Sequence, residues 1–108
     1  MIKTVFAKVL FEATHNWPGC NLEEVSYLQH EHRHIFHIHA YVEVSHNDRQ
    51  IEFIVLKHTI EEYLQKYYPN RKLGSKSCEM LAVELIEAFQ LSKCVVLEDG
   101  ENGVEITL

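Results

Sequence analysis

The sequence has few cysteines, no long apolar run and no excess of positive charge. Its three cysteines, Cys20, Cys78 and Cys94, are odd in number and widely spaced. This pattern argues against a disulfide framework and is typical of a reduced, cytosolic protein. The longest apolar runs are only a few residues, far shorter than a bilayer requires, so no membrane span is predicted.

The charge balance is acidic, with a net charge of −6. It argues against nonspecific binding to nucleic acid or to an anionic membrane. Strand-like alternation begins at Lys3, so no secretory signal is predicted and a cytoplasmic location is expected. A hydrophobic content of 46% excludes a disordered chain, and the length predicts a single domain, 1–108.

Hydrophobic periodicity changes twice along the chain. Alternating segments predict strands over residues 2–13, 33–45, 93–99 and 104–108, and residues 16–31 are expected to form a loop with a short helical turn. A period of 3.6 predicts one helix from about Ile54 to Pro69 and a second starting near the N-cap Ser77. The expected buried positions of these helices are Phe53, Leu56, Ile60, Tyr63, Leu64 and Tyr67, and Leu81, Ala82, Leu85, Ala88 and Phe89. This ββααββ order predicts an α+β fold, an antiparallel sheet with two helices on one face.

Histidines are concentrated at the start of the second predicted strand. His32 and His34 share one face of that strand, about 7 Å apart at Cα. His15 continues the buried face of the first strand, so antiparallel pairing would bring it beside them. Three imidazoles with an open fourth position are typical of catalytic zinc. The alternative is a histidine-rich surface strand, and His37 and His39, on the opposite face, are expected at the surface or a subunit interface.

Three other side chains are candidates for chemistry. Cys20 follows His15 in the loop and could serve as base or nucleophile, although a plain loop cysteine is the alternative. His30 precedes the second strand and could join the site or belong only to the loop. Glu98 ends a strand at a position that alternation places on the buried face. Its carboxylate could accept hydrogen bonds from N–H groups of a heterocycle or simply be solvated.

Several segments match the spacing of known signatures. Phe11–His15 matches Phe-x-Ala-x-His, His32–His34 stands for His-Gly-His, Glu52–Lys57 for Asp-Phe-x-x-Leu-Lys, and Lys76–Ala82 for Pro-Thr-Ser-Glu-Asn-Leu-Ala. Glu98 corresponds to the glutamate of a Val-x-Glu-Thr-like strand. Over nearly its whole length the chain resembles the 6-pyruvoyl-tetrahydropterin synthase / 6-carboxytetrahydropterin synthase family.

The resemblance implies a tunnelling (T-) fold, in which subunits form a trimeric β-barrel that commonly pairs into a hexamer. It implies zinc on His15, His32 and His34, with Glu98 holding the pterin ring and the Ser77 region of a neighbouring subunit assisting. The implied activity is that of a zinc-dependent lyase acting on 7,8-dihydroneopterin triphosphate or a related pterin. One pathway in which such an activity would serve is the 7-deazaguanine (queuosine-type) route.

The chain departs from the family at the residues that transfer protons. The family's cysteine before His-Gly-His is absent from Tyr27–His30, its Asp-His pair has no counterpart in Lys66–Lys72, and Arg33 replaces the central glycine. Cys20 and His30 are the candidate replacement bases. The alternative function is a catalytically inactive oligomer that binds metal and a pterin or purine.

Overall fold

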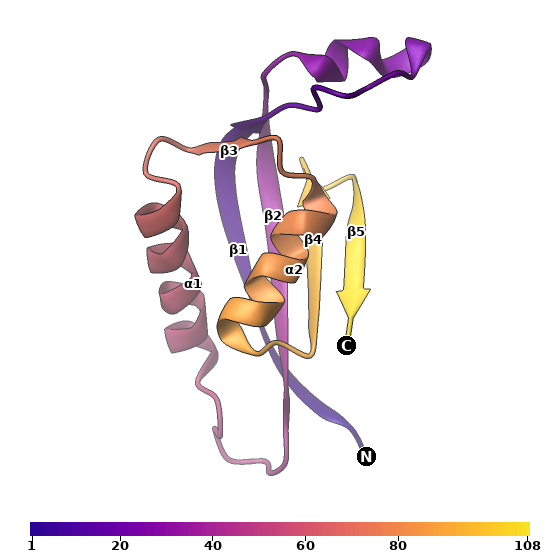
Figure 1. Cartoon of the computed structure of the whole chain (residues 1–108). Helices are drawn as coiled ribbons and strands as arrows, with labels where there is room; N and C mark the ends of the chain where they lie inside the picture. The colour runs from indigo at the N-terminus through magenta and orange to yellow at the C-terminus, as the bar shows by residue number, and fades with distance from the viewer.

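The computed structural model describes all residues, 1–108, as an α+β fold with a five-stranded mixed sheet. In chain order its elements are β1 (Lys3–His15), the 3₁₀ helix η1 (Glu23–Gln29), β2 (His32–Val44), α1 (Phe53–Tyr67), β3 (Lys72–Gly74), α2 (Cys78–Phe89), β4 (Lys93–Glu98) and β5 (Asn102–Thr107). The strand order is β3-β1-β2-β4-β5, and the sheet is open within one chain (Figure 1). The α+β class is confirmed.

The expected ββααββ order omits one strand. Residues 71–76 contain β3, which pairs in parallel with β1 through Thr14–Lys72 and His15–Gly74. The prediction of a wholly antiparallel sheet is therefore wrong at this edge. A strand of three residues is too short to show alternation, so its pairing could not be predicted from periodicity.

The long β1–β2 ribbon determines which side chains face the helices. The strands pair antiparallel along their full length, from Lys3 opposite Val44 to His15 opposite His32. Successive residues point to opposite faces of a sheet. Phe36 and other inward residues of β2 are fully buried, and His32 and His34 continue that side of the strand. The pairing thus places His15, His32 and His34 at one end of one face, as the parity of the two segments predicts.

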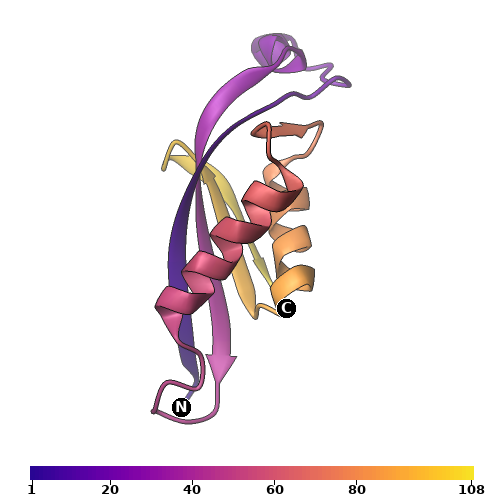
Figure 2. The ribbon, with the colours of Figure 1, turned by 90° about the vertical axis from the view of Figure 1, so that its left-hand side faces the viewer.

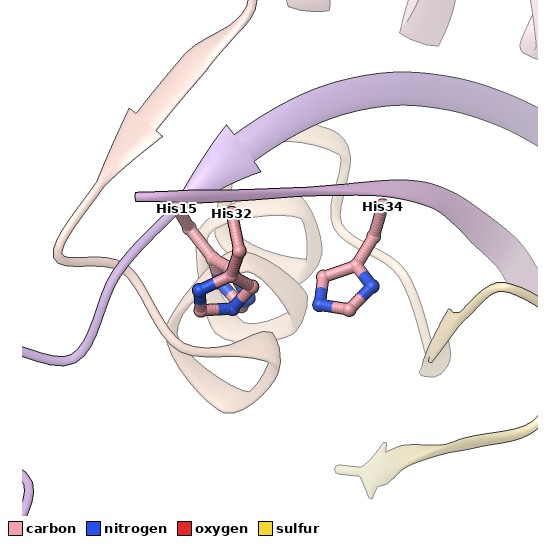
Figure 3. A group of neighbouring side chains, drawn as sticks. All are labelled: His15, His32 and His34. Carbon is pink, nitrogen blue, oxygen red and sulfur yellow. The ribbon is translucent and has the colours of Figure 1, made fainter. Parts of the chain in front are cut away.

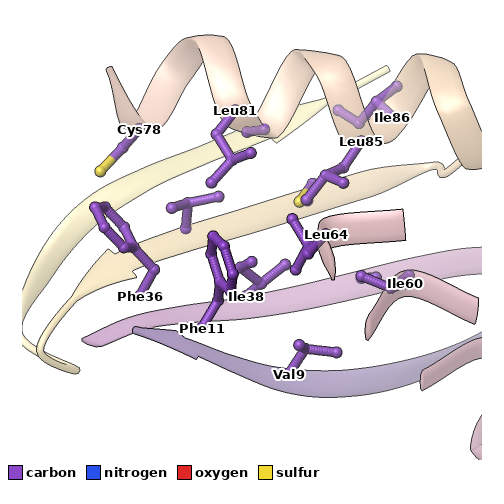
Figure 4. Packing of buried hydrophobic residues seen from close by; sticks show 14 of the residues in the cluster. Val9, Phe11, Phe36, Ile38, Ile60, Leu64, Cys78, Leu81, Leu85 and Ile86 are labelled. Atoms are coloured by element: carbon purple, nitrogen blue, oxygen red, sulfur yellow. The ribbon is translucent and has the colours of Figure 1, made fainter. Parts of the chain in front are cut away.

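The hydrophobic core lies between the sheet and the two α-helices. Both helices cover the same face: α1 packs over β1, and α2 over β4 and β5 (Figure 2). Ile60 and Leu64 of α1 and Leu81 and Leu85 of α2 belong to this one core (Figure 4). No helix is both long and apolar enough to cross a bilayer.

The predicted buried stripes are correct at the centre of each helix and wrong at the ends. Phe53 and Tyr67 are more than half exposed, because they are the first and last residues of α1. Ala88 near the end of α2 is also exposed. Ser77 caps α2 as predicted, with its hydroxyl accepting a hydrogen bond from Met80 N at 3.1 Å.

The β4–β5 hairpin turns one residue earlier than the sequence predicts. Asp99 and Gly100 both have positive φ, at 56° and 73°, and Glu101 N donates to Glu98 O at 3.0 Å. Positive φ at both central residues is the geometry of a type I′ turn, which Asp-Gly favours. Gly103 then pairs so closely with β4 that a Cβ would collide with the Val96 backbone. The turn therefore leaves Glu98 at the end of its strand and Asp99 beside the start of β2.

Candidate metal centre and adjoining cavity

Three imidazoles gather where β1 ends and β2 begins. One ring nitrogen from each of His15, His32 and His34 lies within 4.8 Å of the others. The ring centroids are 4.6 Å apart for His15–His32, 5.0 Å for His32–His34 and 5.3 Å for His15–His34. All three side chains project from the same face of the ribbon (Figure 3). The structure brings together the three residues that the sequence proposes as ligands.

Each imidazole is oriented by a hydrogen bond at Nδ1. The acceptors are Lys76 O at 3.0 Å for His15, His30 O at 2.8 Å for His32 and Asp99 Oδ2 at 2.7 Å for His34. An acceptor at Nδ1 holds a proton there, so each ring in its neutral form would have its lone pair at Nε2. Histidines that bind metals commonly have such partners, which fix the tautomer and the direction of the ring.

The remaining nitrogen of His34 has no partner. Its Nε2 is buried and makes no hydrogen bond, and burying an unsatisfied polar atom costs about 1–3 kcal/mol. A divalent cation at this position would satisfy it. Three neutral imidazole nitrogens are a donor set that suits zinc, so the residues present fit this metal.

Glu98 is the fourth polar side chain of the centre. Its Oε2 lies 3.0 Å from His15 Nε2 and 3.6 Å from His34 Nε2. The hydrogen bond from His15 lowers the pKa of Glu98 although burial opposes this. Burial lowers the pKa of His15, but hydrogen bonds to Glu98 and to the Lys76 carbonyl outweigh it and raise that pKa. Glu98 is thus a carboxylate at neutral pH.

A cavity of about 380 Å³ opens beside the centre. Its size is within the range of small-molecule sites. His15, His32 and Glu98 form its polar end, and Trp17 and Val104 contribute apolar surface. Ser77 lines the same cavity from within the same chain, whereas the resemblance implies a role for this segment across a subunit boundary.

The two candidate bases lie apart from this lining. The Cys20 thiol is buried within its own loop, 3.6 Å from Val25 O. His30 is exposed, and its backbone carbonyl rather than its imidazole contacts His32. Cys78 does line the cavity and its Sγ lies 3.7 Å from Glu98 Oε2. Burial raises the pKa of Cys78 to about 12, so it is a neutral thiol at physiological pH.

Three contributors to the centre were not predicted: the Asp99 carboxylate and the carbonyls of Lys76 and His30. Asp99 accepts hydrogen bonds from His34 and from Ile35 N, the latter at 2.9 Å. Asp-Gly is a recognisable turn signal, and it directly follows Glu98, so Asp99 could have been found. The carbonyls of Lys76 and His30 could not, because every residue carries one.

The Lys76 segment is itself held by a polar cluster between the helices. Glu84 of α2 pairs with Lys76 and accepts hydrogen bonds from Tyr68 at 2.6 Å and Tyr63 at 2.8 Å. Burial opposes ionisation of Glu84, but the hydrogen bonds from Lys76 and the tyrosines hold its pKa below the usual range. The residue whose carbonyl orients His15 is therefore tied to both helices.

Comparison with solved structures finds the same fold in another protein. The crystal structure of an uncharacterized protein from Wolinella succinogenes superposes with a TM-score of 0.75, covering 99% of this chain and 98% of that one, at 11% sequence identity. At this identity the likeness shows the fold alone. No protein-family model matches the chain, and no curated protein matches it.

Proposed function

We propose that the chain is a zinc-dependent lyase, as its resemblance to the 6-pyruvoyl-tetrahydropterin synthase / 6-carboxytetrahydropterin synthase family implies. Its substrate would be 7,8-dihydroneopterin triphosphate or a related pterin. The pathway proposed for it is 7-deazaguanine (queuosine-type) synthesis. One observation carries the proposal: three imidazoles, each oriented through Nδ1, gather at one point, and two of them, His15 and His32, line a ligand-sized cavity. The T-fold barrel, its trimeric or hexameric assembly and a cytoplasmic location belong to the same proposal.

Different residues of the chain would bind the metal and the pterin ring. His15, His32 and His34 would hold zinc, which when bound acidifies and polarises hydroxyl groups of a substrate. The Glu98 carboxylate would accept N–H groups from the ring, since charge-assisted hydrogen bonds of this kind are strong. Trp17 would add an aromatic wall for the ring.

A binding protein is the second candidate, and one observation favours it. The two cysteines nearest the centre in sequence or space are unsuited as bases, because the Cys20 thiol lies within its own loop and Cys78 has a pKa of about 12. Proton transfer during a lyase reaction needs a group near neutral pKa within reach of the substrate. A metal- and pterin- or purine-binding oligomer without turnover would need none.

Metal analysis tests the centre. We expect about one zinc per purified wild-type chain and loss of that zinc in His34→Ala. His39→Ala is the matched control, because it removes a histidine from the opposite face of β2 and should retain the metal. A wild type that binds no zinc under zinc-replete conditions would contradict the proposal.

Product analysis separates the two functions. Zinc-loaded protein is incubated with 7,8-dihydroneopterin triphosphate, and the mixture is examined by mass spectrometry. A new product that depends on His34 supports the lyase. Tight binding of the pterin without conversion supports the binding protein. If the pterin is neither bound nor converted, both candidate functions are contradicted.

A further inference from the structure

Asn102 lies directly opposite Glu98 in the β4–β5 hairpin. Val96 and Val104 pair in the same way further along these strands, and both pack in or against the core. Because alternate residues of a strand share a face, Glu98 and Asn102 continue the core-facing side to its end, where both line the cavity beside the histidines. Directly opposite residues of antiparallel strands have Cβ atoms about 4.5–5.5 Å apart. The Asn102 amide and the Glu98 carboxylate can therefore contact the same small ligand.

Two asparagines line the cavity, and they differ in what their amides contact. Asn16 Nδ2 donates a hydrogen bond to Gln29 O at 3.2 Å, so this donor is occupied. The Asn102 side chain is exposed, and its amide makes no hydrogen bond within the chain. An asparagine amide offers two N–H donors and one carbonyl acceptor. Asn102 is thus a free polar group next to the carboxylate that is proposed to hold the ring.

The rings of pterins and of guanine share one hydrogen-bonding edge. On that edge a ring N–H and the exocyclic amino group form an adjacent pair of donors. Acceptors flank this pair on both sides, the ring carbonyl on one side and the lone pair of a ring nitrogen on the other. A carboxylate that accepts hydrogen bonds from both donors therefore has an acceptor beside it, whichever way the ring lies. The side chain next to Glu98 can complete the contact only by donating a hydrogen bond.

We propose that Asn102 determines ring specificity by donating a hydrogen bond from Nδ2 to the acceptor that flanks the two donors held by Glu98. The inference rests on the proposed function, in which Glu98 accepts N–H groups of the ring, and it adds a second residue that recognises the same edge. Together the two side chains select two adjacent donors flanked by an acceptor. Pterins and guanine carry this pattern, and adenine lacks it. Asn102 lies outside the group of possible metal ligands, so its role is confined to the ring.

Ring affinity tests this role, measured by isothermal titration calorimetry on the zinc-loaded chain with pterin and with guanine as probes. Asn102→Ala should raise the Kd of the bound ring about two- to tenfold, the usual effect of losing one hydrogen bond. Asn102→Asp should raise the Kd further, because this side chain of the same shape places a negatively charged acceptor against the acceptor of the ring. Thr107→Ala is the matched control, since it truncates an exposed polar side chain on the other face of β5 and should bind as the wild type does.

The outcomes distinguish the role of Asn102 from the proposed function. Equal ring affinity in Asn102→Asp and the wild type, with ring binding lost in Glu98→Gln, overturns the role of Asn102 and leaves the proposed ring site intact. Asn102→Ala should keep the zinc Kd of the wild type, and a weaker zinc affinity that accompanies weaker ring binding would overturn the assignment, because Asn102 would then act through the metal. The effect is expected on whichever ring binds, and the tighter of the two probes identifies the ring system. A wild type that binds neither ring contradicts both proposals.

Discussion

At the scale of single residues, the centre depends on groups that direct the histidines. The three acceptors at Nδ1 differ in kind: Lys76 and His30 contribute carbonyls, and Asp99 contributes a carboxylate. Only the carboxylate can be changed by mutation without moving the backbone. The hydrogen bond from Ile35 N, followed by that from His34, holds the pKa of Asp99 below its usual range, so it is charged at neutral pH.

Asp99→Ala should therefore weaken zinc binding. We expect a zinc Kd about 10–100-fold higher, because the His34 ring would lose the partner that fixes its tautomer and direction. Chelator competition provides the measurement, and Glu101→Gln, which removes an exposed charge from the same turn, serves as control. Equal affinity in Asp99→Ala and wild type would show that the strand alone orients His34.

At the scale of elements, the sequence predicts which residues of β1 and β2 face the helices and which lie opposite one another. It does not predict that β3 pairs with β1. Alternation along β1 and β2 is strong enough to place His15 beside His32, and the structure has these residues directly opposite. β3 lacks such a signal, because its pairing with β1 depends on where α1 ends and on tertiary contacts. The carbonyl of Lys76 reaches His15 through that same segment. The sequence therefore predicts which three histidines gather, but not the backbone carbonyls that orient two of them.

Glu84 joins elements that meet around the Lys76 segment, and its charge gives stability a defined pH dependence. Its pKa is lowered in the folded chain, so its stabilising effect is present above the unfolded value of about 4.3 and is lost as pH falls through the folded pKa. Glu84→Gln should lower the free energy of unfolding by about 1 kcal/mol at pH 7, since Lys76 is partly exposed to solvent.

Urea denaturation of wild type and Glu84→Gln at several pH values provides the measurement. The difference between them should shrink as the pH falls below about 4, because the wild-type carboxyl becomes neutral as well. Glu87→Gln, at an exposed position of the same helix, should show little effect at any pH. A difference that does not shrink at all as the pH falls would mean that shape rather than charge is responsible.

At the scale of the whole molecule, one face of the sheet has no cover. The helices occupy the opposite face (Figure 2), which leaves Leu10 64% and Phe6 50% exposed. The chain is also elongated, with a radius of gyration of 14.9 Å against about 13 Å for a compact domain of this length. Both features suit the proposed assembly of several copies.

Leu10→Asp should disrupt that assembly. We expect the wild type to sediment as a trimer or hexamer, and the variant as a smaller species, because a charge would be buried against another subunit. Val55→Asp places the same charge at an exposed position of α1 and serves as control. Sedimentation velocity gives the answer, and a monomeric wild type would contradict the proposed assembly.

The β4–β5 turn has a consequence for the order of folding. His32 and His34 are neighbours on one strand, but Asp99 lies 65 residues from His34 along the chain. Contacts of such long range form late, after the loop between them has closed. Tight capture of the proposed zinc would therefore require a nearly complete native chain, and a chain in which only the β1–β2 ribbon had formed would bind it weakly. Once bound, the ion would slow the opening of that turn, so the rate of metal release would report how often the C-terminal hairpin leaves the sheet.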